Sequence, residues 1–121
     1  MDLPAKAKNI SVILQKPKYA GNIGAAARAA KNMGISNLVV VGSAKKDQEE
    51  IIKRSTHLAA DVVEKIKYVD DIRAALDKFT YIVGTTARKG AARGPFFTPR
   101  TIAEKIASVS QNNKVALLFG P

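Results

Sequence analysis

Two short segments of the chain combine residue types that can hold phosphate groups and act on hydroxyls. The first runs from Pro17 to Arg28 and carries Gly21 and Gly24 at the start of a predicted helix. A helix start offers free N–H groups to an anion, and the glycines would let a ligand approach the backbone. Helical side chains tilt toward the N-terminus, so we expect Arg28 to lean toward this turn and bind a phosphate or approach a hydroxyl. Plain strand-to-helix packing with an exposed arginine explains the glycine spacing equally well.

The second segment, residues 83–90, reads Val-Gly-Thr-Thr-Ala-Arg-Lys-Gly and follows a predicted strand. Ligands of parallel α/β sheets lie beyond the carboxyl ends of the strands, which is where this segment would be. Cationic side chains continue to residue 100 among glycines and prolines, a pattern that suits a loop following a phosphate backbone. The cations of this predicted loop are Arg88, Lys89, Arg93 and Arg100. A solvated basic loop without a ligand is the alternative.

The charge balance points to a polyanionic partner. Lys and Arg number 20 against 10 Asp and Glu, which gives a net charge of +10 over 121 residues. An excess of this size favours nucleic acid over other partners. Aromatic residues make up only 6% and Trp is absent, so phosphate contact is better supported than base stacking. Lys16, just before the first segment, and Lys18, within it, belong with the predicted RNA-binding cations.

Several classes of function are excluded or disfavoured. The chain has no Cys, which excludes disulfides, thiolate metal sites and cysteine nucleophiles. Neither a G-x-G-x-x-G fingerprint nor a G-K-[ST] phosphate loop is present, so a dinucleotide-binding dehydrogenase and a P-loop NTPase are unsupported. His57, the only histidine, lies in a helical region without a catalytic partner and is expected to be structural or exposed. We predict no metal site, no membrane span and a cytoplasmic location.

Near-continuous apolar runs predict the strands that would position these segments. Such runs are typical of strands covered on both faces of a parallel sheet. The predicted strands are Ile10–Gln15, Asn37–Val41, Tyr81–Thr85 and Val115–Phe119, with a short additional strand at 66–69.

Helical spacing fills the intervals between these runs. A helix should begin near residue 20 and end at Gly34, with Met33 in the core, and another at 47–65 should break near Thr56. Asp70 and Thr98 are the expected N-caps of the remaining two helices. The alternation of strand and helix predicts one α/β domain over residues 1–121, with a parallel sheet and helices on both faces.

Several stretches resemble motifs of the SPOUT-class RNA methyltransferases, specifically the SpoU/TrmH branch with its TrmJ-like members. Residues 22–34, Asn-Ile-Gly-Ala-Ala-Ala-Arg-Ala-Ala-Lys-Asn-Met-Gly, are similar to the first motif of that family, and residues 84–88 to a second. Residues 98–100 and 116–121 match further on, in the same order. The resemblance implies the Rossmann-like N-terminal portion of an α/β-knot domain. It also implies transfer of a methyl group from S-adenosylmethionine to a ribose 2′-hydroxyl of tRNA or rRNA.

The resemblance also assigns roles to individual residues. Arg28 would activate the hydroxyl or contact the target phosphate, and Asn22 would position the nucleotide. A cation near the oxygen would stabilise the alkoxide that develops there. The residues implied to line the cofactor pocket are Thr85, Thr86, Ala87 and Gly120.

One departure from the family pattern bears on activity. The family places a C-terminal trefoil knot after the motif that matches Phe119–Pro121, and this knot holds most of the cofactor and much of the homodimer interface. We therefore expect a parent methyltransferase that forms homodimers, and an inactive 121-residue chain that stops before the knot. The main alternative is a non-catalytic basic RNA-binding module. A second is a small-molecule enzyme that binds a phosphorylated substrate at the Gly21 turn.

Overall fold

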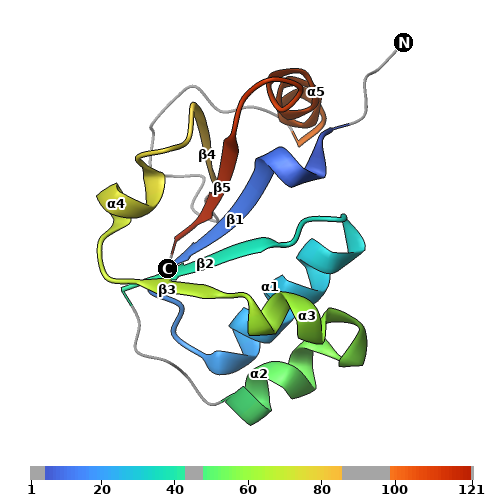
Figure 1. The fold of residues 1–121 in the computed structure, drawn as a ribbon, viewed down its shortest axis with the longest axis vertical. Coiled ribbons are helices and arrows are strands. Elements are labelled where there is room, and N and C mark those ends of the chain that lie inside the picture. The colour runs from blue at the N-terminus through green and yellow to red at the C-terminus, as the bar shows by residue number, and fades with distance from the viewer. Residues whose placement is uncertain (1–4, 43–47, 86–98, 121) are drawn as a thin grey trace.

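The protein folds around a five-stranded parallel sheet with the strand order β3-β2-β1-β5-β4 (Figure 1). The computed structural model describes residues 5–42, 48–85 and 99–120. The strands are β1 (Ile10–Gln15), β2 (Asn37–Val41), β3 (Lys67–Val69), β4 (Tyr81–Thr85) and β5 (Val115–Phe119). The helices are α1 (Ala20–Asn32), α2 (Gln48–Ser55), α3 (Ala60–Glu64), α4 (Ile72–Leu76) and α5 (Pro99–Val109), with short 3-10 helices at Ala7–Asn9 and His57–Ala59. The predicted α/β class and parallel sheet are confirmed.

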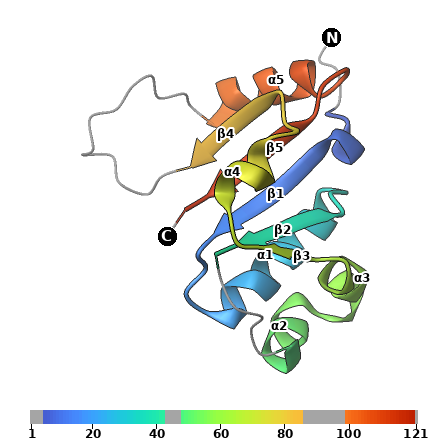
Figure 2. The same cartoon turned by 60° about the vertical axis from the view of Figure 1, so that its left-hand side comes forward.

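The two faces of the sheet are covered unequally. Side chains alternate between the faces along each strand, so Val12 points to one face and Ile13 to the other. The first face packs against α1, α2, α3 and α5 in the larger apolar cluster. The second face packs against α4 and the turn after it in a smaller cluster that includes Ile13, Val39 and Ala75. Figure 2 shows α4 in front of the sheet, with α1 and α5 behind it. Helices on both faces are therefore confirmed, but the described elements cover the second face only in part.

Helix α1 owes its place to small side chains and to the glycine that ends it. Ile23, Ala27 and Ala30 are fully buried against the first face of the sheet. At the C-terminus Gly34 adopts a φ of 78°, and the N–H of Ile35 donates to the Ala30 carbonyl at 2.8 Å. This arrangement satisfies carbonyls that the helix end would otherwise leave unpaired, as predicted for Gly34.

The prediction that Met33 is a core residue is wrong. Met33 is the C-cap of α1 and is 58% exposed. The N–H of Met33 donates to the carbonyls of Ala29 and Ala30, so the backbone continues the helical turn. The buried stripe ends one turn earlier, at Ala30, because the chain then turns at Gly34 to bring Ile35 into the core.

The predicted break near Thr56 separates α2 from the 3-10 helix and α3. Thr56 has a φ of 68°, a left-handed conformation that a helix cannot continue. The buried hydroxyl of Ser55 donates to the Ile52 carbonyl at 2.9 Å, so this polar group is paired at the break. The break lets α2 cross α1 while α3 leads to β3.

Two predicted N-caps have different outcomes. Asp71, not Asp70, caps α4, because the Asp71 carboxylate accepts a hydrogen bond from the Arg73 N–H at 3.0 Å. Helix α5 begins at Pro99 as predicted. Thr98 lies outside the described residues. No helix in the described ranges is long and apolar enough to span a bilayer.

Candidate functional site

The order of the strands indicates where a ligand would bind at the carboxyl ends of the strands. From β1 the chain builds the sheet toward β2 and β3, whereas β4 and β5 lie on the other side of β1. In open α/β sheets the crevice at such a reversal, beyond the carboxyl ends of the strands, is the usual ligand site. Lys16 follows β1 at this point and Gly120 follows β5. We call this side of the sheet the carboxyl edge.

The backbone at the carboxyl edge is held in an unusual conformation. Lys16 has a φ of 49°, and the N–H of Lys16 donates to the Val41 carbonyl at 2.8 Å. Gly42 has a φ of 69° and donates its N–H to the Val69 carbonyl at 2.8 Å. A Cβ on Gly42 would lie 3.2 Å from Lys16 Cγ, so glycine lets the Lys16 side chain pass close by. A left-handed conformation costs a non-glycine residue about 1 kcal/mol, and such strain gathers at functional sites.

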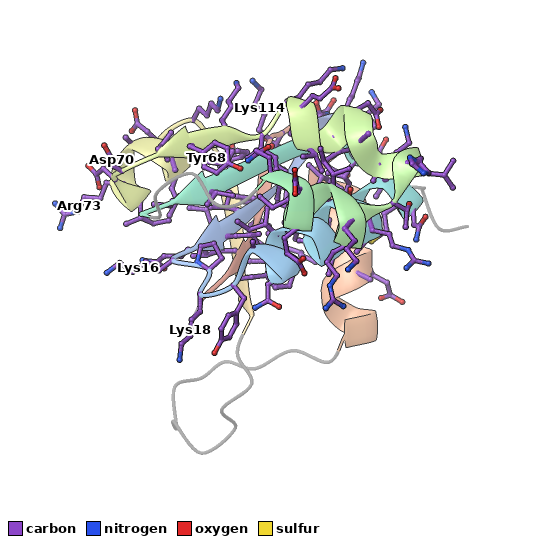
Figure 3. All side chains as sticks on the ribbon, turned by 90° about the horizontal axis from the view of Figure 1, so that it is seen from below. Lys16, Lys18, Tyr68, Asp70, Arg73 and Lys114 are labelled. Atoms are coloured by element: carbon purple, nitrogen blue, oxygen red, sulfur yellow. The ribbon has the colours of Figure 1, made fainter. Side chains whose placement is uncertain are left out.

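The turn from β1 into α1 presents exposed cations. Lys16, Lys18 and Tyr19 are exposed, and Lys18 Nζ lies 5.6 Å from the centre of the Tyr19 ring, within the range of a cation–π contact. In Figure 3 Lys16 and Lys18 extend from the same end of the molecule into solvent. The predicted RNA-binding residues Lys16 and Lys18 are therefore placed where a polyanion could reach them.

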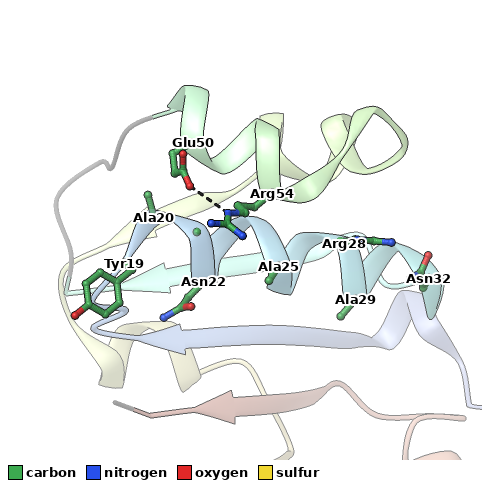
Figure 4. A pocket seen from close by; sticks show the side chains of 10 residues that line it. Tyr19, Ala20, Asn22, Ala25, Arg28, Ala29, Asn32, Glu50 and Arg54 are labelled. Atoms are coloured by element: carbon green, nitrogen blue, oxygen red, sulfur yellow. Dashed lines mark hydrogen bonds and ion pairs between the residues drawn. The ribbon is translucent and has the colours of Figure 1, made fainter.

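The predicted catalytic pair, Asn22 and Arg28, lines one surface hollow along α1. The hollow has a volume of about 790 Å³ and we call it the α1 hollow (Figure 4). Asn22 lies in the first turn of α1 and Arg28 in its second half, and both are exposed. The other lining residues are Tyr19, Ala20, Gly21, Ala25, Ala29, Asn32, Glu50 and Arg54.

Arg28 does not lean back toward the turn, contrary to the sequence expectation. Figure 4 shows its side chain extending toward Asn32, away from Tyr19 and Asn22. Arg28 is also eight positions after Ala20, which puts its Cα about 12 Å along the helix axis from the start. The tilt of a helical Cβ fixes only the first bond, and the long exposed side chain of arginine can turn either way. The α1 hollow therefore brings Asn22 and Arg28 to one surface without pointing them at each other.

Arg54 of α2 is a lining residue that the sequence analysis missed. Arg54 Nε lies 3.2 Å from Glu50 Oε1, and this ion pair spans one helical turn. A Cβ on Gly21 would lie 3.5 Å from Arg54 Cγ, so the arginine stem passes directly over the start of α1. The spacing of Glu50 and Arg54 is the signal that was available, but nothing in the local sequence shows that α2 crosses α1.

Gly24 serves helix packing, not the approach of a ligand. A Cβ on Gly24 would lie 2.4 Å from the Ile51 carbonyl oxygen and 2.7 Å from Arg54 Cβ. Only glycine allows this close crossing, which places Arg54 and Glu50 beside the start of α1. The expectation that Gly24 opens the backbone to a ligand is wrong.

The residues implied to bind the cofactor are partly described. Thr85 pairs with Phe119 on the neighbouring strand, and Phe119 pairs in turn with Leu14 of β1. Gly120 comes next in the chain, so Thr85 and Gly120 lie at the ends of adjacent strands. Phe119 is 40% exposed there, and a Cβ on Gly120 would meet nothing within 4 Å. Thr86 and Ala87 lie outside the described residues.

The predicted basic loop is mostly outside the described part of the chain. This applies to Arg88, Lys89 and Arg93. Arg100 lies in the first turn of α5, where only the backbone is described. Their predicted roles therefore stay predictions.

The chain belongs to the SpoU rRNA Methylase family, whose model matches residues 9–121. A tRNA (cytidine/uridine-2′-O-)-methyltransferase TrmJ from Sodalis glossinidius is 37% identical over 112 residues, which cover 93% of this chain and 44% of the relative. The enzyme of the same name from Salmonella typhimurium is 34% identical over 113 residues, or 93% of this chain and 46% of its own. The chain thus spans less than half the length of these relatives.

Solved structures show the same fold. A probable methylase family protein from Haemophilus influenzae aligns with a TM-score of 0.83 at 35% identity, over 97% of this chain and 47% of its own. TrmJ from Z. mobilis ZM4 aligns with a TM-score of 0.81 at 28% identity, over 92% of this chain and 49% of its own. The resemblance noted from the sequence is therefore confirmed, and the chain is a member of an RNA methyltransferase family.

Proposed function

We propose that this protein is part of an S-adenosylmethionine-dependent methyltransferase that modifies ribose 2′-hydroxyls of tRNA. The observation that carries the proposal is the family match over residues 9–121, which includes the cationic carboxyl edge. The names of the TrmJ relatives supply the substrate and the reacting atom. A tRNA substrate would also place the protein in the cytoplasm.

The carboxyl ends of β4 and β5 suit the binding of the methyl donor. Exposed apolar surface on Phe119 could cover an adenine ring, and Gly120 leaves the backbone open beside it. Thr85, Thr86, Ala87 and Gly120 are the residues that would hold the donor. S-adenosylmethionine, when bound, supplies a methyl group on a positively charged sulfur.

The residues of α1 would act on the RNA. Asn22 can donate and accept hydrogen bonds to position the target nucleotide at the carboxyl edge. The Arg28 guanidinium can hold a phosphate beside that nucleotide or stabilise negative charge that develops on the ribose oxygen. Arg28 points along the α1 hollow, which favours the phosphate-holding role of the two. Lys16, Lys18, Arg88, Lys89, Arg93 and Arg100 would contact the RNA backbone.

We further propose that the 121 residues do not transfer methyl groups alone and that the active form is a homodimer of a longer chain. The longer chain is supported by the match, because these residues correspond to 44% of the Sodalis glossinidius relative, and the homodimer is what the family resemblance implies. The 2′-O-methyltransferase activity stated in the name of that relative is a property of the whole relative, not of the matching 44%.

Calorimetric titration with S-adenosylmethionine tests the proposal. A chain extended to the length of the relatives should bind the donor saturably, and the 121-residue chain should bind it weakly or not at all. Absence of binding by the extended chain would contradict the proposal. A non-catalytic RNA-binding module would then be favoured, provided that RNA affinity falls steeply with salt.

A further inference from the structure

A second hollow lies at the amino ends of the strands, the end of the sheet opposite to the carboxyl edge. Helix α4 covers the second face near Val41 and Val69 and leaves the region near Ser11 and Asn37 open. The hollow there has a volume of about 200 Å³. Its floor contains Ser11 and Asn37, which are direct register partners on β1 and β2.

Five lysines from five separate segments surround this floor. They precede β1, end α3, start β3, follow α4 and precede β5, and all five are exposed. Among the described residues, no aspartate or glutamate lines the hollow. Within the described ranges the ion pairs are Lys31–Asp61 and Glu50–Arg54, so neither engages this group. The five lysines of what we call the lysine hollow are Lys8, Lys65, Lys67, Lys78 and Lys114.

Cations that gather around a polar floor without carboxylates favour an anion. Their mutual repulsion is relieved when a negative group binds between them, and lysine ammonium groups are strong donors to phosphate oxygens. The Asn37 amide adds a neutral donor at the floor. Ser11 is 7% exposed, so a polar side chain occupies a position where the strand would otherwise be apolar.

The size and openness of the lysine hollow decide which phosphate it suits. Pockets for drug-sized ligands and cofactors run from about 300 to 1,000 Å³. The volume here, about 200 Å³, suits one phosphate group with its sugar outside. Exposed lysines hold phosphates without fixing a base, which is the kind of contact proteins make to a nucleic-acid backbone.

The lysine hollow is well separated from the carboxyl edge. A five-residue strand is about 17 Å long, so the two lie roughly that distance apart along the sheet. Figure 3 places Lys114 well apart from Lys16 and Lys18. A free nucleotide cannot contact both places, but a folded RNA can.

We propose that the lysine hollow binds a backbone phosphate of the substrate RNA, away from the nucleotide that is modified. This inference rests on the proposed function, because it takes RNA as the substrate. The lysine hollow then contributes affinity for RNA and no chemistry.

Binding of fluorescently labelled tRNA by the 121-residue chain tests the inference between about 50 and 200 mM KCl. The double variant Lys67→Gln/Lys114→Gln should bind about tenfold more weakly, as expected for two lost exposed ion pairs. Its log–log salt slope should fall by about 1.5. The matched control Lys53→Gln/Lys105→Gln removes the same charge from exposed sites on α2 and α5 and should stay within about twofold of the wild type. Circular dichroism establishes that each variant is folded.

The outcomes separate the inference from the proposed function. If the wild type binds tRNA and both double variants lose affinity equally, the inference is overturned and the proposed function stands. If the wild type does not bind tRNA at all, the inference is overturned, whereas the proposed function is decided by the titration of the extended chain. If AMP or inorganic phosphate displaces tRNA from the wild type but not from the Lys67→Gln/Lys114→Gln variant, the lysine hollow is a small-molecule site and the inference is again overturned.

Discussion

The α1 hollow and the lysine hollow hold their cations in different ways. In the α1 hollow, Arg54 is paired with Glu50 and lies over glycines at a close helix crossing. The lysine hollow gathers five exposed lysines, and no carboxylate is found among the described residues that line it. The ion pair and the close packing fix the position of Arg54 in the α1 hollow. The exposed lysines of the lysine hollow supply positive charge, with few contacts that fix their positions. Reactions depend on position, whereas backbone binding depends on charge, so we assign chemistry to the carboxyl edge with the α1 hollow and affinity to the lysine hollow.

The largest expected effect comes from Arg28→Ala in a chain of the relatives' length. Loss of a cation that holds the target phosphate or stabilises the ribose oxygen should lower methyl transfer about a hundredfold, or about 2.7 kcal/mol. Steady-state kinetics should show the loss mainly in kcat, because a phosphate held beside the reacting hydroxyl fixes the position of that hydroxyl in the transition state. In the same chain Lys67→Gln/Lys114→Gln should raise KM for tRNA and leave kcat near the wild-type value. If the two variants changed the same parameter, the division between the two hollows would be wrong.

Gly24→Ala should break the geometry of the α1 hollow. The new Cβ would lie 2.4 Å from the Ile51 carbonyl oxygen, so α1 and α2 must move apart. We expect a loss of about 2 kcal/mol in the free energy of unfolding, measured by urea denaturation. Gly21→Ala is the control, since its Cβ would make an ordinary contact 3.5 Å from Arg54 Cγ and should be neutral or stabilising. Equal stability of the two variants would contradict the packing described here.

Lys16→Gly separates strain from charge at the carboxyl edge. Glycine adopts a φ of 49° at no steric cost, so the variant should gain up to about 1 kcal/mol in stability while losing affinity for tRNA. Lys18→Gly removes the same charge at a residue that does not have a positive φ. Because glycine relieves no strain there, this variant should be less stable than the wild type. Thermal denaturation and tRNA binding of both variants measure the two effects. A stability loss at Lys16→Gly would show that the conformation there is not strained.

The smallest effect is expected at the Lys31–Asp61 ion pair. The hydrogen bond from Lys31 Nζ, at 2.9 Å, lowers the pKa of the exposed Asp61 carboxyl. A lowered folded-state pKa stabilises the protein above the unfolded-state pKa, and this contribution is lost as the pH falls through the folded-state value. Asp61→Asn should therefore be slightly less stable than the wild type near pH 6, and the difference should shrink as the pH falls below about 3.9, the ordinary pKa of an aspartate. Urea denaturation as a function of pH measures it, and Lys31→Gln should remove the pH dependence of the difference.

The strands and the helix break at Thr56 were predictable from the sequence, whereas the contacts between segments far apart in the chain were not. The bounds of β1 and β2 agree with prediction because each is a continuous apolar run, and Thr56 interrupts a helical pattern. The sequence analysis placed the N-cap of α4 at Asp70, one residue before the observed cap Asp71, because either of two adjacent aspartates can cap a helix.

The parts of the site that were missed depend on tertiary structure. Arg54 reaches the α1 hollow only because Gly24 lets two helices cross, and the pairing of Ser11 with Asn37 depends on strand register. The five lysines of the lysine hollow are spread from residue 8 to residue 114, so no local pattern could reveal them.

The most direct test of the central claim is to incubate unmodified tRNA with S-adenosylmethionine and a chain of the relatives' length, then analyse the digested nucleosides by mass spectrometry. We predict a 2′-O-methylated nucleoside that is absent without enzyme and strongly reduced with Arg28→Ala. A tRNA that carries no added methyl group, or one methylated on a base, would contradict the assignment.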